Sequence, residues 1–146
     1  MKTNQYIFSV LLLLFFSCTF TTDQKKVTKD QEKALVMVEN FYKYIAIDDY
    51  SKLSNLIGVS EKFTAKEMDS IVYGVVNSQD KLLGKVDSRV LKSIESNVDT
   101  SKNHIVKYNV IYETIRNRKR FKETFDLVLQ GNDIKVDEYL VTPIKG

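Results

Sequence analysis

The longest regular pattern in the chain is an alternation of apolar and polar residues in its C-terminal part. From His104 to Thr114 the even positions are mostly aromatic or β-branched, and most of the odd positions are polar. A period of two places alternate side chains on opposite faces of a strand, and these residue types favour a pleated surface. Residues 120–130 and 134–142 repeat the pattern, so three strands are predicted, with a polar break at residues 116–119.

The breaks between these stretches carry residues that suit tight turns. Asn117 lies in the first break, and Gly131 with Asn132 in the second. Gly and Asn tolerate positive φ, which the common hairpin turns require. Pro143 cannot donate a ladder hydrogen bond, so it is predicted to end the last strand. The three strands therefore form an antiparallel meander.

The region before the meander has the 3.6-residue period of amphipathic helices. One helix is predicted over residues 28–47, beginning at a capping box of Thr28 and Gln31, with Asp30 as an alternative cap. A short second helix is predicted over residues 50–57, after the capping residues Asp48-Asp49. A third helix is predicted over residues 64–79, and it begins at a capping box of Thr64 and Glu67.

One further strand is predicted between the helices and the meander, over residues 86–98. Its apolar residues share one parity, with Lys92 as the exception, and a strand of this length is expected to bend or to carry a bulge. Helices followed by antiparallel strands indicate an α+β domain, predicted here over residues 30–146. The face of the sheet opposite the helices is also partly apolar, which permits a homodimer through the sheet. Its apolar residues include Ile105, Ile111 and Ile115.

Length and composition set broad limits. A chain of 146 residues with 43% hydrophobic residues is sufficient for one domain with a real core. A net charge of +3 is too small to indicate nucleic-acid binding, and no nucleic-acid partner is expected. The only cysteine is Cys18, so the chain has no internal disulfide.

The first residues have the pattern of an export signal. Lys2 precedes an apolar run over residues 7–16, which is too short to span a bilayer and fits the core of a signal peptide. Ser17 before Cys18 resembles the lipidation site of bacterial lipoprotein signals, although Phe15-Phe16 departs from that pattern. An ordinary cleaved secretory signal is the alternative.

The resemblance to lipoprotein signals implies a location. Residues 1–17 would be removed as the signal peptide, and Cys18 would become the N-terminus and carry a lipid such as palmitate. Residues 18–29 then form a short polar tether. We expect a membrane-anchored lipoprotein of the bacterial cell envelope, facing the periplasm.

Several motifs resemble a bacterial lipoprotein family of unknown function in the nuclear transport factor 2-like (cystatin-like cone) superfamily. They are Phe41-Tyr42, Asp49-Tyr50, the Leu-Gly-Lys-Val-Asp-Ser-Arg segment at residues 83–89, and the closing Val-Asp-Glu-Tyr at residues 136–139. The Trp that often stands near Ile134 in that group is missing. The resemblance implies a curved four-stranded sheet wrapped around the first helix as a cone. It implies no activity and no cofactor.

Glu123 is the most informative polar residue because it lies between Phe121 and Phe125 on the apolar parity of its strand. A carboxylate there would be desolvated, which raises its pKa and suits a general base or a cation-binding group. Alternatively, Glu123 pairs with Lys92 or with a tyrosine hydroxyl, or it lies near the end of the strand in water.

Several tyrosines are candidates for a ligand pocket, since tyrosine combines apolar area with a polar group. The alternative is that their rings fill the core between helix and sheet. Besides Tyr73, these ligand-binding candidates are Tyr42, Tyr108, Tyr112 and Tyr139.

A cluster of cations is predicted at the first hairpin tip. Such a tip could bind an acidic partner or anionic head groups, or it could protect the turn from aggregation. The residues of this predicted basic tip are Arg116, Arg118, Lys119, Arg120 and Lys122.

The sequence lacks the motifs of common enzymes and metal sites. There is one histidine, His104, and no Gly-rich phosphate loop or nucleophile elbow, so neither a metal nor a cofactor is expected. Three functions stay open: a non-enzymatic module that binds a small ligand or an envelope protein, an enzyme that uses Glu123 with a tyrosine, and an assembly factor that works through the basic tip.

Overall fold

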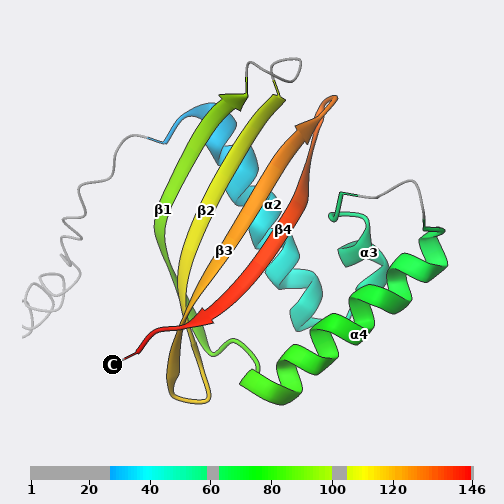
Figure 1. Cartoon of the computed structure of the whole chain (residues 1–146), viewed down its shortest axis with the longest axis vertical. Helices are drawn as coiled ribbons and strands as arrows, with labels where there is room; N and C mark the ends of the chain where they lie inside the picture. Colours follow the sequence, from blue (N-terminus) through cyan, green and yellow to red (C-terminus); the bar gives the residue numbers. More distant parts are fainter. Residues whose placement is uncertain (1–26, 59–62, 100–104, 146) are drawn as a thin grey trace, which may run out of the picture.

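The computed structural model describes residues 27–58, 63–99 and 105–145, and its helices precede a curved antiparallel sheet (Figure 1). The sheet has the order β1-β2-β3-β4, as a meander requires. The predicted α+β cone is confirmed. The elements are α2 Lys29–Ala46, α3 Tyr50–Ser54, α4 Ala65–Leu83, β1 Ser88–Asp99, β2 Ile105–Arg116, β3 Lys119–Gln130 and β4 Asp133–Pro143.

Two tight hairpins set the register of the meander. The β2–β3 turn holds Asn117 and Arg118 at φ values of 48° and 64°. Such paired positive φ values match the twist of the flanking strands. The β3–β4 turn holds Gly131 at φ 64°, after which Asp133 pairs with the last residue of β3.

Each outer strand carries an irregularity. The register between β1 and β2 shifts between Leu91 and Ser93, so the bend or bulge predicted for this long strand is confirmed, and the structure locates it at Lys92. A second shift, between β3 and β4, leaves Asp137 outside the pairing and was not predicted. Although Val90 and Val98 share the apolar parity of β1, both are at least half exposed because β1 is an edge strand.

The predicted helix starts are confirmed by capping boxes at Thr28 and Thr64 in which both reciprocal hydrogen bonds form. The predicted ends were less accurate. The short helix stops at Ser54 rather than at residue 57, because the chain then pairs with β4. α4 continues past residue 79 to Gly84, whose φ of 86° ends it.

The core lies between α2 and the inner face of the sheet. Phe41 of α2 packs edge-on against Phe125 of β3, at a ring-centroid distance of 5.1 Å. α4 covers α3 and lies beside the β4 edge of the sheet (Figure 1). No helix in the described ranges is long and apolar enough to cross a membrane. Residues buried in this core include Ala34, Met37, Val38, Phe41, Tyr42, Leu53, Tyr108, Val110, Tyr112, Phe125, Leu127 and Val136.

Candidate functional site

Glu123 lies at the centre of a buried polar network. Its side chain has 0% exposure, and both carboxylate oxygens accept hydrogen bonds. Oε1 accepts from the hydroxyl of Thr114 at 2.7 Å and from Nε of Arg116 at 2.8 Å. Oε2 accepts from the hydroxyls of Tyr42 at 2.9 Å and Tyr139 at 2.6 Å. Four protein donors thus satisfy the carboxylate, as a buried charge requires.

Arg116 is the charge partner of Glu123, and it ties α4 to the sheet. The residue is 1% exposed, and its Nη1 donates to the carbonyl of Gly84 at 2.8 Å and lies 3.6 Å from the Asp80 carboxylate. Nη2 donates to the Tyr139 hydroxyl at 3.3 Å. Burial alone would lower the pKa of Arg116, but the hydrogen bond and charge of Glu123 raise it, so the guanidinium stays charged.

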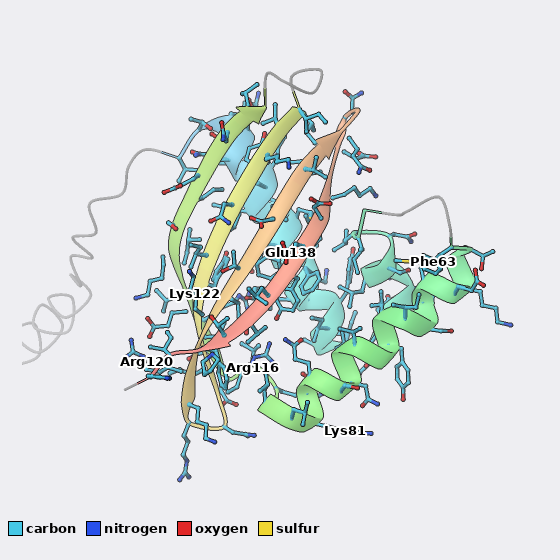
Figure 2. The ribbon with its side chains drawn as sticks, in the orientation of Figure 1. Phe63, Lys81, Arg116, Arg120, Lys122 and Glu138 are labelled. Atoms are coloured by element: carbon cyan, nitrogen blue, oxygen red, sulfur yellow. The ribbon has the colours of Figure 1, made fainter. Side chains whose placement is uncertain are left out.

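The placement of Arg116 at an exposed hairpin tip was wrong. Arg116 is the last residue of β2 and continues the even parity that buries Thr114 and the residues before it. That parity was the signal that could have placed Arg116 inside. The exposed tip consists of Arg118, Lys119 and Arg120, with Lys122 farther along β3 (Figure 2).

The network is built to hold charge in place. Burial, followed by the Glu123 carboxylate, raises the pKa of Tyr42 and of Tyr139 far above the ordinary tyrosine value, so both stay protonated donors. The predicted pairing of Glu123 with a tyrosine hydroxyl is confirmed. The predicted pairing with Lys92 is wrong, because Lys92 pairs with Glu113 at 3.1 Å on the other face of the sheet.

Aromatic rings occupy the space beside the network. The ring of Phe125 lies 4.7 Å from Tyr139 and 5.5 Å from Tyr42. Tyr108 and Tyr112 are 4% and 5% exposed and face the same core. Three of the tyrosine candidates therefore pack as core residues, and Tyr139 is half-buried between the core and the surface.

A second set of side chains covers Tyr42 from the β1 side. The guanidinium of Arg89 lies over the Tyr42 ring, 4.6 Å from its centroid, in a cation–π arrangement. Arg89 also pairs with Glu39, which accepts a hydrogen bond from the Tyr112 hydroxyl at 3.2 Å. This cluster closes the approach to the aromatic core from β1.

An apolar groove of about 190 Å³ lies between α4 and the beginning of β4. Its rim is poorly covered, since Ile71 is 43% exposed and Val75 is 59% exposed. Sequence reasoning missed this groove, although the apolar stripe of α4 is wider than its contact with α3. The residues that line this α4 groove are Phe41, Leu53, Ile57, Met68, Ile71, Val72, Val75, Val76, Gln79, Val136, Asp137 and Tyr139.

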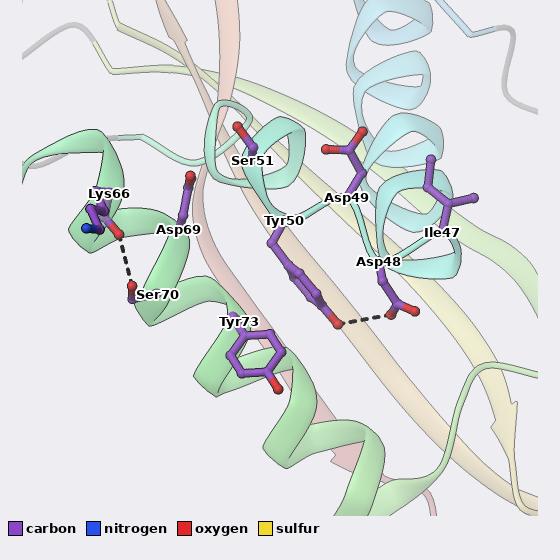
Figure 3. Close-up of a pocket in the computed structure, with 9 residues that line it drawn as sticks. All are labelled: Ile47, Asp48, Asp49, Tyr50, Ser51, Lys66, Asp69, Ser70 and Tyr73. Atoms are coloured by element: carbon purple, nitrogen blue, oxygen red, sulfur yellow. Dashed lines mark hydrogen bonds between the residues drawn. The ribbon is translucent and has the colours of Figure 1, made fainter.

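An acidic hollow of about 670 Å³ lies between α3 and α4 (Figure 3). Its carboxylates already have partners within the protein. Asp48 accepts from the Tyr50 hydroxyl at 3.0 Å, and Asp49 pairs with Lys52 at 2.8 Å. Asp69 accepts from the hydroxyl of Ser54. The candidate Tyr73 lies here, half exposed, and not in the cone.

In the described ranges, no three histidine, cysteine, aspartate or glutamate side chains converge as a metal site would require. His104 and Cys18 lie outside the described residues.

Comparisons with known proteins show the fold alone. No family model matches the sequence, and no curated protein sequence matches it. Two solved yeast structures are similar: the complex of the deubiquitinase Ubp3 with its cofactor Bre5, and the Ubp3-associated protein Bre5. Each is 12% identical with a TM-score of 0.53 and covers 82% of this chain, and the chain covers 100% and 99% of theirs. These neighbours support the cone fold that the superfamily resemblance implied.

Proposed function

We propose that this chain is an exported, lipid-anchored protein of the bacterial cell envelope, whose cone domain binds a protein partner at its surface. It would belong to the lipoprotein family of unknown function that its motifs resemble. The interior would serve stability, and the surface would serve binding. We prefer this role to catalysis at Glu123 and to a small ligand held inside the cone.

The observation that carries the proposal is the saturation of Glu123. A catalytic or ligand-binding carboxylate needs a free acceptor position that faces substrate. Here both oxygens accept from protein donors, and Phe125 and Tyr139 pack beside them. A substrate would have to displace these donors and the rings that cover them.

Support for the anchor comes from the sequence. Residues 1–17 have the basic start and short apolar run of an export signal, and Cys18 follows a small residue. A lipid on Cys18 would hold the domain at a membrane by a short tether, where one partner surface can stay accessible.

The comparisons are compatible with a binding module. One similar structure is titled as a deubiquitinase with its Bre5 cofactor, so that fold serves protein association there. At 12% identity, this likeness supports a protein-binding role in general and indicates no particular partner.

The outer face of the sheet supports self-association as one form of partner binding. A row of uncharged side chains crosses the four strands on this face. The neighbouring row on one side carries three carboxylates, and the region on the other side carries three cations together with Glu113. If two copies pack face to face about a two-fold axis that runs along the uncharged row, the acids of one copy lie over the cations of the other. The uncharged row is Ser93, Ile111, Thr124 and Leu140; the acids are Glu95, Asp126 and Glu138; the cations are Lys92, Arg120 and Lys122.

The proposal is tested by native mass spectrometry of the protein extracted from its own cell envelope after mild cross-linking. We expect the polypeptide with an N-terminal lipid and a cross-linked protein, with no additional small molecule. A Cys18→Ser variant should lose the lipid and leave the membrane fraction. A reproducible small-molecule adduct that Glu123→Gln abolishes, with no protein partner, would contradict the proposal.

Self-association is tested separately by sedimentation. A Leu140→Asp variant places a charge in the uncharged row, where Leu140 is 51% exposed, so the fold should survive. We expect it to shift a dimer to monomer, while Leu82→Asp on α4 serves as the matched control. An unchanged dimer in Leu140→Asp would place the contact elsewhere.

A further inference from the structure

Among the described residues the sheet ends at β4, and most of that strand has no backbone partner on its outer edge. β4 is the last strand in the sheet order, and the described residues contain one isolated bridge to it, between Ile57 and Val136. There Val136 donates to the carbonyl of Leu56 and accepts from the N–H of Gly58, both at 2.8 Å. The chain therefore already adds a short extended segment to this edge.

The bridge shows which backbone groups of β4 point outward farther along. Residues of an antiparallel strand direct their N–H and C=O groups alternately toward and away from the neighbouring strand. The backbone N–H and C=O of Val136 point away from β3, whereas the backbone N–H of Ile144 points toward β3 and donates to the carbonyl of Arg120 at 3.0 Å. With Asp137 outside the register, the outward positions between them are Tyr139, Val141 and Pro143, of which Pro143 has no N–H to donate. Within the described ranges, no segment pairs with this part of the edge.

The α4 groove lies along the same edge. Val136, Asp137 and Tyr139 line both the strand edge and the groove, and α4 supplies the opposite wall. A strand added to β4 would place alternate side chains on the inner side of the sheet, toward the exposed apolar rim of Ile71 and Val75. Backbone pairing and apolar burial are thus available together.

We propose that an extended peptide segment of a partner protein binds here by adding a strand to β4 at Tyr139–Val141, in line with Leu56–Gly58. Its alternate apolar side chains enter the α4 groove. This inference rests on the proposed function and names the partner's form. Free backbone donors and acceptors supply affinity in such strand addition, and pockets for alternate side chains supply specificity.

Charge complementarity defines one end of the peptide. The charged residue of the groove lining is Asp137, with no cation in the same lining. A lysine or arginine of the peptide near the bridge would pair with the Asp137 carboxylate. The occupant is therefore an extended segment with alternate apolar residues and a basic residue at one end.

The test uses the full chain in detergent and a phage-displayed library of random twelve-residue peptides. We expect enriched peptides with alternate apolar positions and a basic end. Measured by fluorescence polarisation, their binding should weaken by about tenfold or more in Val75→Glu, which charges the groove rim. Leu82→Glu is the matched control, because Leu82 is 82% exposed on the same helix and does not line the groove; its binding should be unchanged.

Backbone pairing is tested with the peptide itself. Two versions of the peptide are compared, one N-methylated at its odd residues and one at its even residues, so that backbone donors are removed and side chains are kept. Only the version that loses the donors facing β4 should bind more weakly, by about tenfold. The amides of Tyr139 and Val141 should exchange fast in the free protein and slowly in the complex. No enrichment, equal binding to Val75→Glu, or binding that N-methylation leaves intact would overturn the inference.

The outcomes separate this inference from the proposed function. If a cross-linked partner is found in the envelope but its binding is lost in Leu140→Asp and kept in Val75→Glu, the proposed function stands and the strand addition falls. If neither a partner nor a peptide is found, both fall.

Discussion

The two long helices, α2 and α4, are alike in length, capping and amphipathicity but differ in what they cover. They have 18 and 19 residues, begin at equivalent capping boxes and are both amphipathic. α2 buries five residues, from Ala34 to Tyr42, against the sheet, whereas α4 buries three and leaves Ile71 and Val75 largely exposed. Helices with the same length, caps and amphipathic pattern are thus a core helix in one case and a partly covered helix in the other.

The difference separates stability from binding. The face of α2 meets aromatic rings and the Glu123 network, where every polar group is satisfied. The face of α4 meets α3 and otherwise forms a wall of an open groove. An apolar surface left at a groove beside a free strand edge is where a partner gains contact, since burial of apolar area drives association.

The largest contrast is expected from one truncation on each helix. Phe41→Ala removes a 3% exposed ring that contacts Phe125 and Tyr139, and it should lower the free energy of unfolding by about 4 kcal/mol. Val75→Ala, at a 59% exposed position, should change it by less than about 0.5 kcal/mol. Urea unfolding followed by circular dichroism measures both, and similar losses would remove the distinction between the two helices.

The next effect concerns the buried ion pair. Glu123→Gln keeps the side-chain shape but removes the nearer and fully buried carboxylate beside Arg116, leaving only Asp80 at 3.6 Å, so it should destabilise the fold by about 3 kcal/mol. Thermal unfolding measures the loss. Combining Glu123→Leu with Arg116→Met removes both charges but leaves the hydroxyls that donated to Glu123 without their acceptor, so it should recover only part of the stability. A fully stable Glu123→Gln protein would mean that the network is dispensable.

Substituting alanine for two glycines of the α4 region should give smaller changes in stability of opposite sign. Gly84 has φ 86° and ψ 164°, a conformation suited to glycine, and an added Cβ would lie 2.3 Å from the Asn117 side chain. Gly84→Ala should therefore cost about 2 kcal/mol. Gly74 lies inside α4 with open space around it, so Gly74→Ala should stabilise by about 0.5–1 kcal/mol. Thermal shifts of equal sign would contradict the assignment.

The smallest effect is a pH dependence on the outer face of the sheet. Hydrogen bonds from Arg120 and then Lys92 lower the pKa of Glu113 from 4.5 to about 2. A lowered folded-state pKa gives stability that is present above pH 4.5 and lost as the pH falls toward 2. Urea midpoints between pH 5 and pH 2.5 measure this slope, and Glu113→Gln should flatten it. An unchanged slope in that variant would assign it to other carboxylates.

The fold could be predicted because its signals are local. Capping boxes at Thr28 and Thr64 and the period-two strands each depend on neighbouring residues, and each is confirmed. The end of α3 could not be predicted, since it depends on the distant pairing of Ile57 with Val136. The same limit applies to the bulge at Asp137, which depends on how β3 and β4 fit together.

The candidate site could be predicted only in part. The inward position of Glu123 and its tyrosine partners followed from strand parity. Arg116 was misplaced because a basic residue next to a turn suggests exposure, although its own parity pointed inward. The α4 groove depends on the angle between α4 and β4, which residue periodicity does not contain.

The central claim, that binding occurs at the α4 groove and not inside the cone, is tested most directly by photo-cross-linking in living cells. A benzophenone amino acid would replace Val75 at the groove rim, with Leu82 as the control position on the same helix. Our account predicts a specific cross-link to another polypeptide from position 75 and none from position 82. Cross-links of equal strength from both positions, or none from position 75, would contradict it.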